Sequence, residues 1–321
     1  MKSIYELDEV NQIATVDCQY IKPLLASAYI VVDGDEVAII ETNTSRSVPI
    51  ILTALQELDK SVEQVKYIIV THVHLDHAGG AGSLMQLCQN ATLLAHPRAG
   101  RHLIDPSRLV NSSIEVYGEE SFRKLYGEIL PVVANRVRTL NDGEEVKLGN
   151  RTFKFLHTRG HANHHFCIYD SKSNGVFTGD SFGIAYPILQ TGGPYIYPTS
   201  TPTDFDPDEA RKSITKIRET GCSKLYLTHF GKFTTVDEAE RQMRQGLDFL
   251  EDQLNNSILK LKAGNSIDSI QQEVATFILE RMMNEMKNRG VSLDNEANQM
   301  MGFDAELNAQ GIVFTASRRA R

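Results

Sequence analysis

The histidines of this chain are unevenly distributed, since seven of the ten fall in two short windows. The first window places His72, His74, Asp76 and His77 within six residues, directly after the apolar run 67–70. In an extended segment, residues two apart point the same way, so His72 and His74 can converge on one metal ion. Asp76 and His77 lie past the bend and can serve a second metal ion beside the first. The window therefore predicts a metal site.

The first window does not hold enough ligands for two metal ions. A catalytic zinc ion typically takes three protein ligands and leaves one position for water. His161, Asp180 and His229 follow other segments that have the pattern of buried strands. Because ligands of open α/β architectures gather beyond one end of the strands, we expect one site assembled from four strand ends.

Strand and helix patterns alternate up to about residue 235, which predicts a catalytic domain over residues 1–235. An Asp-Gly turn at residues 33–34 joins two alternating segments, as in a β-hairpin. The predicted strands are 24–32, 36–41, 67–70, 91–95, 136–140, 144–148, 151–157, 165–170, 175–178 and 224–228. The predicted helices are 47–58, 79–88 and 206–221.

Two segments of this domain are predicted to be additions to the strand-helix pattern. Residues 98–130 have the character of a helical insertion. Residues 181–205 form a long loop rich in Gly, Pro, Thr and Tyr. A loop of this length without its own secondary structure is usually functional, so we expect a lid-like role. Asp206 then serves as the N-cap of the next helix, with Pro207 in its first turn.

Beyond residue 235 the pattern becomes helical only, which predicts a C-terminal helical region over 236–321. Thr235 and Glu238 are spaced as a capping box at the start of a long amphipathic helix that ends at Gly264. A second helix is expected over 267–288. Helices that cover the enzyme body are the first interpretation, and a dimerisation or partner role is the alternative.

Composition narrows the classes of partner. The 33 Lys and Arg residues against 41 Asp and Glu give a formal net charge of −8, and the one basic run, 318–321, has the character of a solvated tail. This balance argues against nucleic acid as the partner. No apolar stretch approaches the ~20 residues of a membrane span, and the first residues do not resemble a secretory signal. Four widely spaced cysteines are typical of a reducing compartment. We expect a cytoplasmic protein with a small-molecule substrate and without nucleic-acid or membrane partners, with a homodimer left open.

The motifs together resemble a known family. Thr-His-x-His-x-Asp-His-x-Gly-Gly at 71–80, Gly-His at 160–161, Thr-Gly-Asp at 178–180 and Thr-His-Phe-Gly at 228–231 look like the metallo-β-lactamase-fold hydrolases, and most of all their glyoxalase II-like branch. The resemblance covers roughly residues 20–235. It implies an α/β (α+β) fold, the αβ/βα four-layer sandwich, with a dinuclear metal site in the cleft between two β-sheets and the helical region appended.

The resemblance also implies ligand sets and a reaction. The first metal would be held by His72, His74 and His161, the second by Asp76, His77 and His229, with Asp180 bridging both. Two divalent metal ions, zinc first and iron or manganese as alternatives, would supply a bridging hydroxide at neutral pH. Asp76 and Asp180 would be the catalytic carboxylates. The expected activity is hydrolysis of a small ester, thioester or lactone.

Residues around the ligands are candidates for supporting roles. His164 and His165 come soon after His161 and could orient it, whereas Tyr195 and Tyr197 in the 181–205 loop could line a pocket. Outside these candidates, the structural interpretation is favoured for His157, His96 and His102.

Two other functions stay open. An iron-dependent oxygenase of the persulfide dioxygenase type resembles the same branch and uses one iron ion. A signalling or interaction protein with incidental hydrolysis is the other. The C-terminal helices, together with the polar Gly-His-x-x-x-His segment at 160–165, resemble more weakly the quinolone-signal response protein of this superfamily.

Overall fold

The computed structural model describes residues 4–201 and 205–320, and their contacts divide the chain into two compact units. The first unit holds the chain up to His157 together with residues 164–179 and 217–234. The second unit holds residues 158–163, 180–216 and the chain from Thr235 onward. The domain boundary expected at residue 235 stays a prediction. None of the described helices is long and apolar enough to cross a membrane.

The first unit contains a seven-stranded mixed sheet in the order β1 to β7. The first four strands pair antiparallel, and β4 to β7 pair parallel. The bounds are β1 (Tyr5–Asp8), β2 (Ile13–Asp17), β3 (Ser27–Asp33), β4 (Glu36–Ile40), β5 (Val65–Ile69), β6 (Thr92–Ala95) and β7 (Val137–Thr139). Strands β5 and β6 end in the segments that lead to His72 and His96 respectively.

A second mixed sheet in the same unit has the order β13-β12-β11-β10-β9-β8. Its pairs are antiparallel except for β11 with β12. The bounds are β8 (Glu145–Leu148), β9 (Arg151–His157), β10 (Phe166–Asp170), β11 (Gly175–Gly179), β12 (Lys224–Leu227) and β13 (Gly231–Phe233). The ends of β11 and β12 lead directly to Asp180 and His229.

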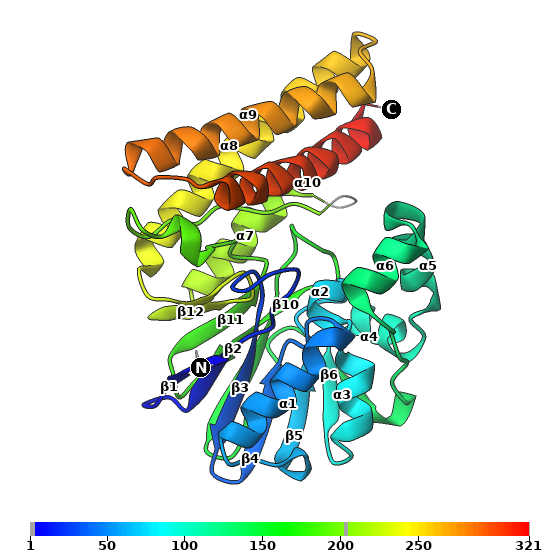
Figure 1. Cartoon of the computed structure of the whole chain (residues 1–321), viewed down its shortest axis with the longest axis vertical. Coiled ribbons are helices and arrows are strands. Elements are labelled where there is room, and N and C mark those ends of the chain that lie inside the picture. Colours follow the sequence, from blue (N-terminus) through cyan, green and yellow to red (C-terminus); the bar gives the residue numbers. More distant parts are fainter. Residues whose placement is uncertain (1–3, 202–204, 321) are drawn as a thin grey trace. The chain divides into compact units, whose positions relative to one another are not determined.

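Alternation along the strands separates two cores. In β3, Ala28 and Ile30 join a cluster with residues of the helices, whereas Tyr29 and Val31 join a cluster with residues of the second sheet. Successive side chains of a strand point to opposite faces, so one apolar strand serves both layers. The helices of this unit are α1 (Val48–Glu57), α2 (Leu75–Ala78), α3 (Ala81–Leu87), α4 (Pro97–Ile104), α5 (Ser107–Tyr117) and α6 (Glu119–Tyr126). Figure 1 shows α1 and α3 on the outer side of the first sheet.

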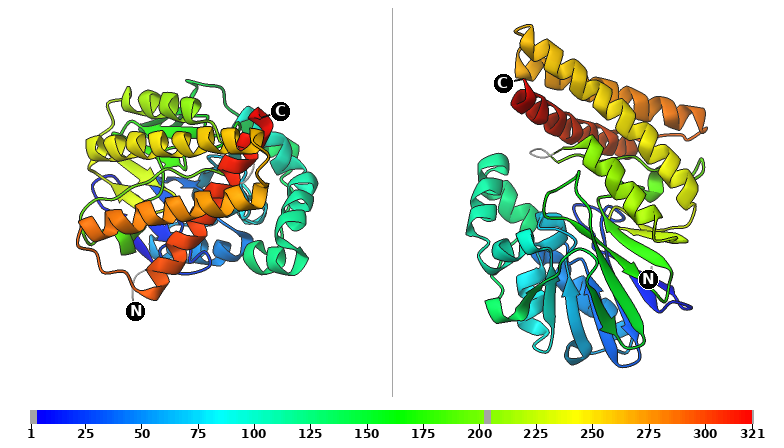
Figure 2. Two further views of the ribbon diagram at one scale, coloured as in Figure 1. Left: turned by 90° about the horizontal axis from the view of Figure 1, so that it is seen from above. Right: turned by 180° about the vertical axis from the view of Figure 1, so that it is seen from behind.

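The second unit is mainly helical. It contains most of α7 (Pro207–Arg218), all of α8 (Val236–Lys262), α9 (Ile267–Asn288) and α10 (Asn295–Arg319). Helix α10 crosses α8 and α9 and packs against both (Figure 2). The expected fold class, two mixed sheets with helices and an appended helical region, is confirmed.

Most predicted elements are confirmed, with instructive differences. The predicted helix 79–88 corresponds to α3, and the short helix α2 before it was not predicted. The predicted insertion 98–130 contains most of α4 and all of α5 and α6. Strands β1, β2 and β13 and helix α10 were not predicted. The buried face of α10 includes Ala305, Asn308 and Gly311, small or polar residues that give no clear apolar period.

Three local predictions concern the ends of helices in the second unit. Asp206 caps α7, because the backbone N–H of Glu209 donates to its carboxylate at 3.1 Å. The capping box at Thr235 is wrong, because Thr235 makes no side-chain cap bond and Glu238 instead accepts from Arg241. Arg318 and Arg319 are exposed, as the solvated-tail prediction expects, but they lie in the last turn of α10, where cations complement the helix dipole. Arg321 and residues 202–204 of the 181–205 loop lie outside the described residues.

The 181–205 loop has some structure of its own. It contains a 3₁₀ turn at Pro187–Leu189 and a bridge between Ile184 and Tyr197. Its tyrosines at 186, 195 and 197 are buried. The loop is therefore a packed segment of the second unit over its described residues, and the lid-like role stays a prediction.

A buried guanidinium ties the two sheets of the first unit together. Arg151 of β9 is fully buried and donates to Asp170 of β10 at 3.0 Å. It also donates to the carbonyl oxygens of Asn11, in the turn between β1 and β2, and of Val32 in β3, at 2.6 and 3.2 Å. A buried ion pair that loses one partner leaves an uncompensated charge in the interior.

We expect Arg151→Met to lower the free energy of unfolding by about 3–5 kcal/mol, because Asp170 would stay buried without its cation. Urea unfolding followed by far-UV circular dichroism measures this change. The matched control is Arg123→Met, since Arg123 pairs with Glu119 at 2.9 Å on the exposed surface. Such a pair contributes at most about 1 kcal/mol. Equal losses in the two variants would contradict this account.

Candidate metal centre

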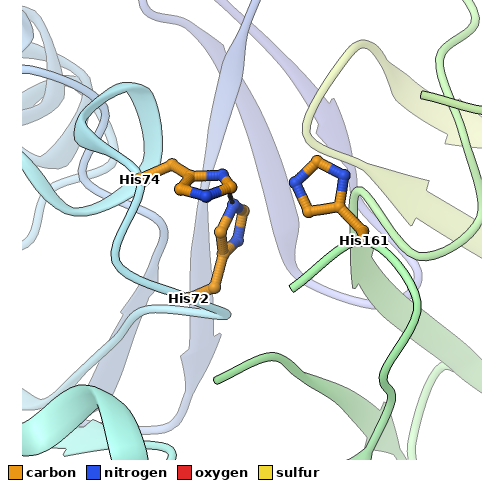
Figure 3. Close-up of side chains that lie close together, drawn as sticks. All are labelled: His72, His74 and His161. Carbon is orange, nitrogen blue, oxygen red and sulfur yellow. Dashed lines mark hydrogen bonds between the residues drawn. The ribbon is translucent and has the colours of Figure 1, made fainter. Parts of the chain in front are cut away.

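The segment after β5 presents the first two histidines side by side. His72 Nε2 and His74 Nδ1 are 2.7 Å apart, as drawn by the dashed line in Figure 3, which also shows His161 of the second unit. His72 is fully buried, and its Nδ1 lies 3.0 Å from the Thr71 hydroxyl. The convergence expected from the spacing is present, because the two rings lie against one another, but the chain bends at Thr71 and His72 rather than running straight. Two imidazole nitrogens at this distance can share a proton or a metal ion.

A second group of ligand atoms lies in the same unit. Asp76 Oδ2 is 3.4 Å from His229 Nε2 and 3.8 Å from His77 Nε2. One ligand atom from each of these three residues lies within 4.8 Å of the others. His77 and His229 are buried, and Asp76 is partly exposed. A carboxylate and two imidazoles that converge in this way form a donor set suited to Zn²⁺, Fe²⁺ or Mn²⁺.

Backbone contacts hold the short helix α2 that carries Asp76 and His77. The carbonyl of His77 accepts from the N–H of Thr42 at 2.9 Å, and the carbonyl of Asp76 accepts from Asn43 Nδ2 at 2.8 Å. A Cβ at Gly80 would lie 2.7 Å from the Thr42 carbonyl oxygen. The Gly-Gly pair of the motif therefore permits the close approach of the α2 segment to the segment after β4.

Glu41 directly follows β4 and contacts a candidate ligand, although no motif in the sequence marks it. It is almost fully buried, and its Oε1 lies 3.2 Å from His77 Nδ1. The hydroxyls of Thr71 and Thr228 also donate to this oxygen. The carboxylate thus joins the segments that precede His72 and His229. In the sequence, Glu41 is marked only as a single acidic residue after an apolar strand.

The two histidines of this group have an acceptor behind the ring. His77 Nδ1 faces Glu41, and His229 Nδ1 faces the carbonyl of Leu25 at 2.7 Å. An acceptor at Nδ1 keeps the proton there and leaves Nε2 with its lone pair, which is the form that binds a metal ion. The orientation and the tautomer both favour coordination.

The remaining predicted ligands, His161 and Asp180, belong to the second unit and lie together. His161 Nε2 is 3.2 Å from Asp180 Oδ2, and both side chains are buried. His161 Nδ1 lies 3.4 Å from the carbonyl oxygen of Thr199. Gly160, with φ of +118°, precedes His161, and a Cβ there would overlap the backbone of Ala210 in α7. Glycine is therefore required where the chain turns toward the helix.

Comparison with known proteins assigns the family. The model of the metallo-β-lactamase superfamily matches residues 21–229. The chain belongs to the metallo-β-lactamase superfamily. All seven predicted ligand positions lie within the matched segment.

Individual relatives are distant. The metallo-β-lactamase fold-containing protein ST1585 of Sulfurisphaera tokodaii is 26% identical over 240 residues, which are 74% of this chain and 84% of that protein. Its crystal structure, described as an archaeal metallo-β-lactamase superfamily protein from Sulfolobus tokodaii, superposes with a TM-score of 0.60 and 23% identity over 73% of this chain and 85% of that one. This likeness shows the superfamily fold.

Two relatives are named for their reactions. The hydroxyacylglutathione hydrolase GloC of Haemophilus influenzae is 26% identical over 207 residues, 60% of this chain and 79% of the relative. The acyl-coenzyme A thioesterase MBLAC2 of Gallus gallus is 25% identical over 112 residues, 35% of this chain and 40% of the relative.

His164 and His165, the histidines predicted to have supporting roles, lie beside His72 and His74. The ring of His165, fully buried, is 4.8 Å from that of His72, and the ring of His164 is 5.6 Å from that of His74. A Cβ at Gly179 would lie 2.5 Å from His165 Nε2. The two histidines are therefore placed where an orienting role is possible, and that role stays a prediction.

Tyr195 and Tyr197 lie against a cleft of the second unit, and their role in a substrate pocket stays a prediction. Tyr197 donates to Asp304 of α10 at 2.6 Å, and its ring is 5.5 Å from that of Tyr195. Both tyrosines line a cleft of about 710 Å³ in the second unit, and burial raises the pKa of both phenols. His96 caps α4 and contacts the ring of His157. Burial lowers the pKa of His96 to about 3, which keeps its ring neutral.

We expect Glu41→Gln to lower zinc affinity about 10–100-fold, because the amide replaces the carboxylate that orients His77. The matched control is Glu36→Gln, at the opposite end of β4, where the carboxylate pairs with Lys66 at 2.8 Å on the surface. Competition with a chromophoric chelator measures both affinities. Thermal unfolding of the metal-free variants monitors the fold. Unchanged zinc affinity in Glu41→Gln would contradict the orienting role.

Proposed function

We propose that this superfamily member is a dinuclear metallohydrolase of the glyoxalase II-like branch that cleaves small thioesters, or related esters and lactones. The convergence of Asp76, His77 and His229, two of them with an acceptor behind Nδ1, is the observation that carries the proposal. The carboxylate and the two imidazoles direct lone pairs toward the same point. This arrangement favours a bound metal ion over contacts between the three side chains themselves.

The proposed ligands are those of the sequence motifs. Asp76, His77 and His229 would hold one ion. The pair His72 and His74 would hold the other, completed by His161, with Asp180 shared by both. The 3.2 Å approach of His161 Nε2 to Asp180 Oδ2 supports this assignment. With Nδ1 facing a carbonyl, Nε2 presents a lone pair to a carboxylate, and a cation between the two relieves their repulsion.

Each residue then has a defined task. When bound, two divalent ions lower the pKa of a coordinated water and polarise the scissile carbonyl. Asp76, which is partly exposed, orients the nucleophilic water through a carboxylate oxygen. Glu41 fixes His77, and the carbonyl of Leu25 fixes His229, so the ligands do not reorganise during the reaction.

The thioester preference is supported by the named relatives. GloC and MBLAC2 act, by their names, on a glutathione thioester and on acyl-coenzyme A thioesters. Zinc is the metal that we propose first, since nitrogen and carboxylate ligands in this ratio suit it. Hydrolysis of an S-acyl thiol would transfer the acyl group to water and release the thiol.

We expect His161→Ala and Asp180→Asn each to lower thioester hydrolysis by more than about 100-fold, since loss of a ligand exceeds the 10–100-fold loss of an orienting partner. Release of free thiol from S-acyl substrates is measured with a thiol reagent. His102→Ala is the control, because His102 lies on α4, outside the predicted ligands. Undiminished turnover in both ligand variants would show that the site is misassigned.

Removal of the metal ions separates the hydrolase from the oxygenase. We expect two zinc ions per chain by elemental analysis, loss of hydrolysis after chelation, and recovery with zinc. One iron ion per chain, with oxygen uptake on a persulfide, would contradict the hydrolase proposal.

A further inference from the structure

The cleft of about 710 Å³ in the second unit is lined by helices α8 and α9 and by the loop segment 195–198. Figure 2 shows the two helices running alongside each other, with α10 crossing both. None of the described residues that line the cleft is a proposed metal ligand. Its volume falls within the range of small-molecule sites in proteins. The cleft is therefore a candidate binding site with its own set of residues.

Tyr195 places an unused hydroxyl at this cleft. The residue is only 7% exposed, and its backbone is fixed, because its N–H donates to Gln190 Oε1 at 2.8 Å. Within the described part of the chain, the hydroxyl has no hydrogen-bond partner. Burial raises the pKa of this phenol, so the hydroxyl stays protonated and can donate at neutral pH. A buried donor without an acceptor costs free energy, and a ligand oxygen would supply the acceptor.

Arg281 of α9 supplies a positive charge to the same cleft. Its guanidinium lies 4.6 Å from the centre of the Phe249 ring, and it donates to the carbonyl of Gln245 at 3.3 Å. Among the described residues it forms no ion pair with a carboxylate. The charge of Arg281 also lowers the pKa of Tyr195, against the larger effect of burial, which shows that the two groups are near each other. One ligand group can therefore meet both donors.

The other charges around the cleft do not neutralise Arg281. Arg241 and Arg289 each pair with a carboxylate one turn earlier on their own helix. Glu280 lines the cleft and is exposed, but consecutive residues of a helix do not face each other. One guanidinium thus remains for a ligand. A single positive charge matches a monoanion, such as a carboxylate, better than a doubly charged phosphate.

Two phenylalanine rings give the cleft an apolar part. Phe249 of α8 and Phe277 of α9 both line it, and Phe277 is 42% exposed. Covering exposed apolar surface is favourable in water. A chain or ring of carbon atoms attached to the carboxylate would cover these two side chains.

We propose that this cleft binds a carboxylate that carries an apolar chain, such as a fatty acid. Arg281 and the Tyr195 hydroxyl donate to the carboxylate oxygens, and the chain lies against Phe249 and Phe277. Hydrogen bonds to an ionised acceptor are about twice as strong as neutral ones. Hydrolysis of acyl thioesters releases carboxylates of this class. The inference does not depend on that proposed function, because its residues hold no metal ion.

The ligand class is tested with octanoate as the probe, by isothermal titration calorimetry of the full chain at neutral pH. We expect octanoate to bind, and octanamide, which has the same chain without the charge, to bind about 10-fold more weakly or less. Acetate, which lacks the chain, should not bind. Octanamide that binds as tightly as octanoate, or octyl phosphate that binds more tightly, would overturn the choice of a monoanion. No octanoate binding in the millimolar range would overturn the proposal as a whole.

Variants locate the site. Arg281→Gln and Tyr195→Phe should each weaken octanoate binding about 10-fold, because each removes a hydrogen bond to a charged group. The matched control is Arg318→Gln, since Arg318 also lies over a phenylalanine ring, 5.9 Å from that of Phe314, but on α10 and outside the cleft. Glu280→Gln should bind octanoate at least as tightly as the wild type.

Three results would overturn this assignment. The first is unchanged binding in both Arg281→Gln and Tyr195→Phe, with folds equal by far-UV circular dichroism. The second is weaker binding in Glu280→Gln, which would indicate a cationic group on the ligand. The third is binding that persists in Arg281→Gln and disappears on chelation, which would place octanoate at the metal centre instead.

Discussion

Three of the proposed ligands share one constraint, a hydrogen-bond acceptor fixed behind the ring. Glu41 faces Nδ1 of His77, the Leu25 carbonyl faces Nδ1 of His229, and the Thr199 carbonyl faces Nδ1 of His161. An imidazole binds a metal ion only through an unprotonated nitrogen, so the position of the proton decides whether a histidine can be a ligand. The rest of the structure can be understood as the means of keeping these acceptors in place.

In the first unit, the sheets supply that support. Glu41 follows a strand that is buried on both faces, and two threonine hydroxyls from neighbouring strand ends donate to it. The end of β12 is tied to β3, because Ser27 and Tyr29 donate to the carbonyl oxygens at residues 227 and 228. Parallel and antiparallel strand ends thus reach one edge with little freedom, which limits reorganisation of the ligands.

In the second unit, helices supply the support. The segment that contains Thr199 has little regular structure, so its backbone groups must find partners outside a ladder or a helix. Asn308 of α10 and Gln242 of α8 provide them, since Asn308 accepts from the N–H of Ser200 at 2.8 Å and Gln242 accepts from the N–H of Ile196 at 2.9 Å. The appended helices are therefore part of the structure that holds the segment beside His161, in addition to any role toward a partner.

The sequence by itself predicted the candidate ligand residues, and it determined the alternation of strands and helices and the fold class. Period-two and period-3.6 patterns are local, and a motif such as His72-x-His74-x-Asp76-His77 is contained in one strand end. Glu41, Asn308 and the peptide between Thr199 and Ser200 were decided only by the tertiary structure. An acceptor behind an imidazole can come from any segment that folding brings close, and two of the three here are backbone carbonyls, which have no letter in the sequence. Helix α10 was missed for a related reason: its buried face uses Gly311, Asn308 and Asp304 to approach a loop, and close backbone contact leaves no hydrophobic period to detect.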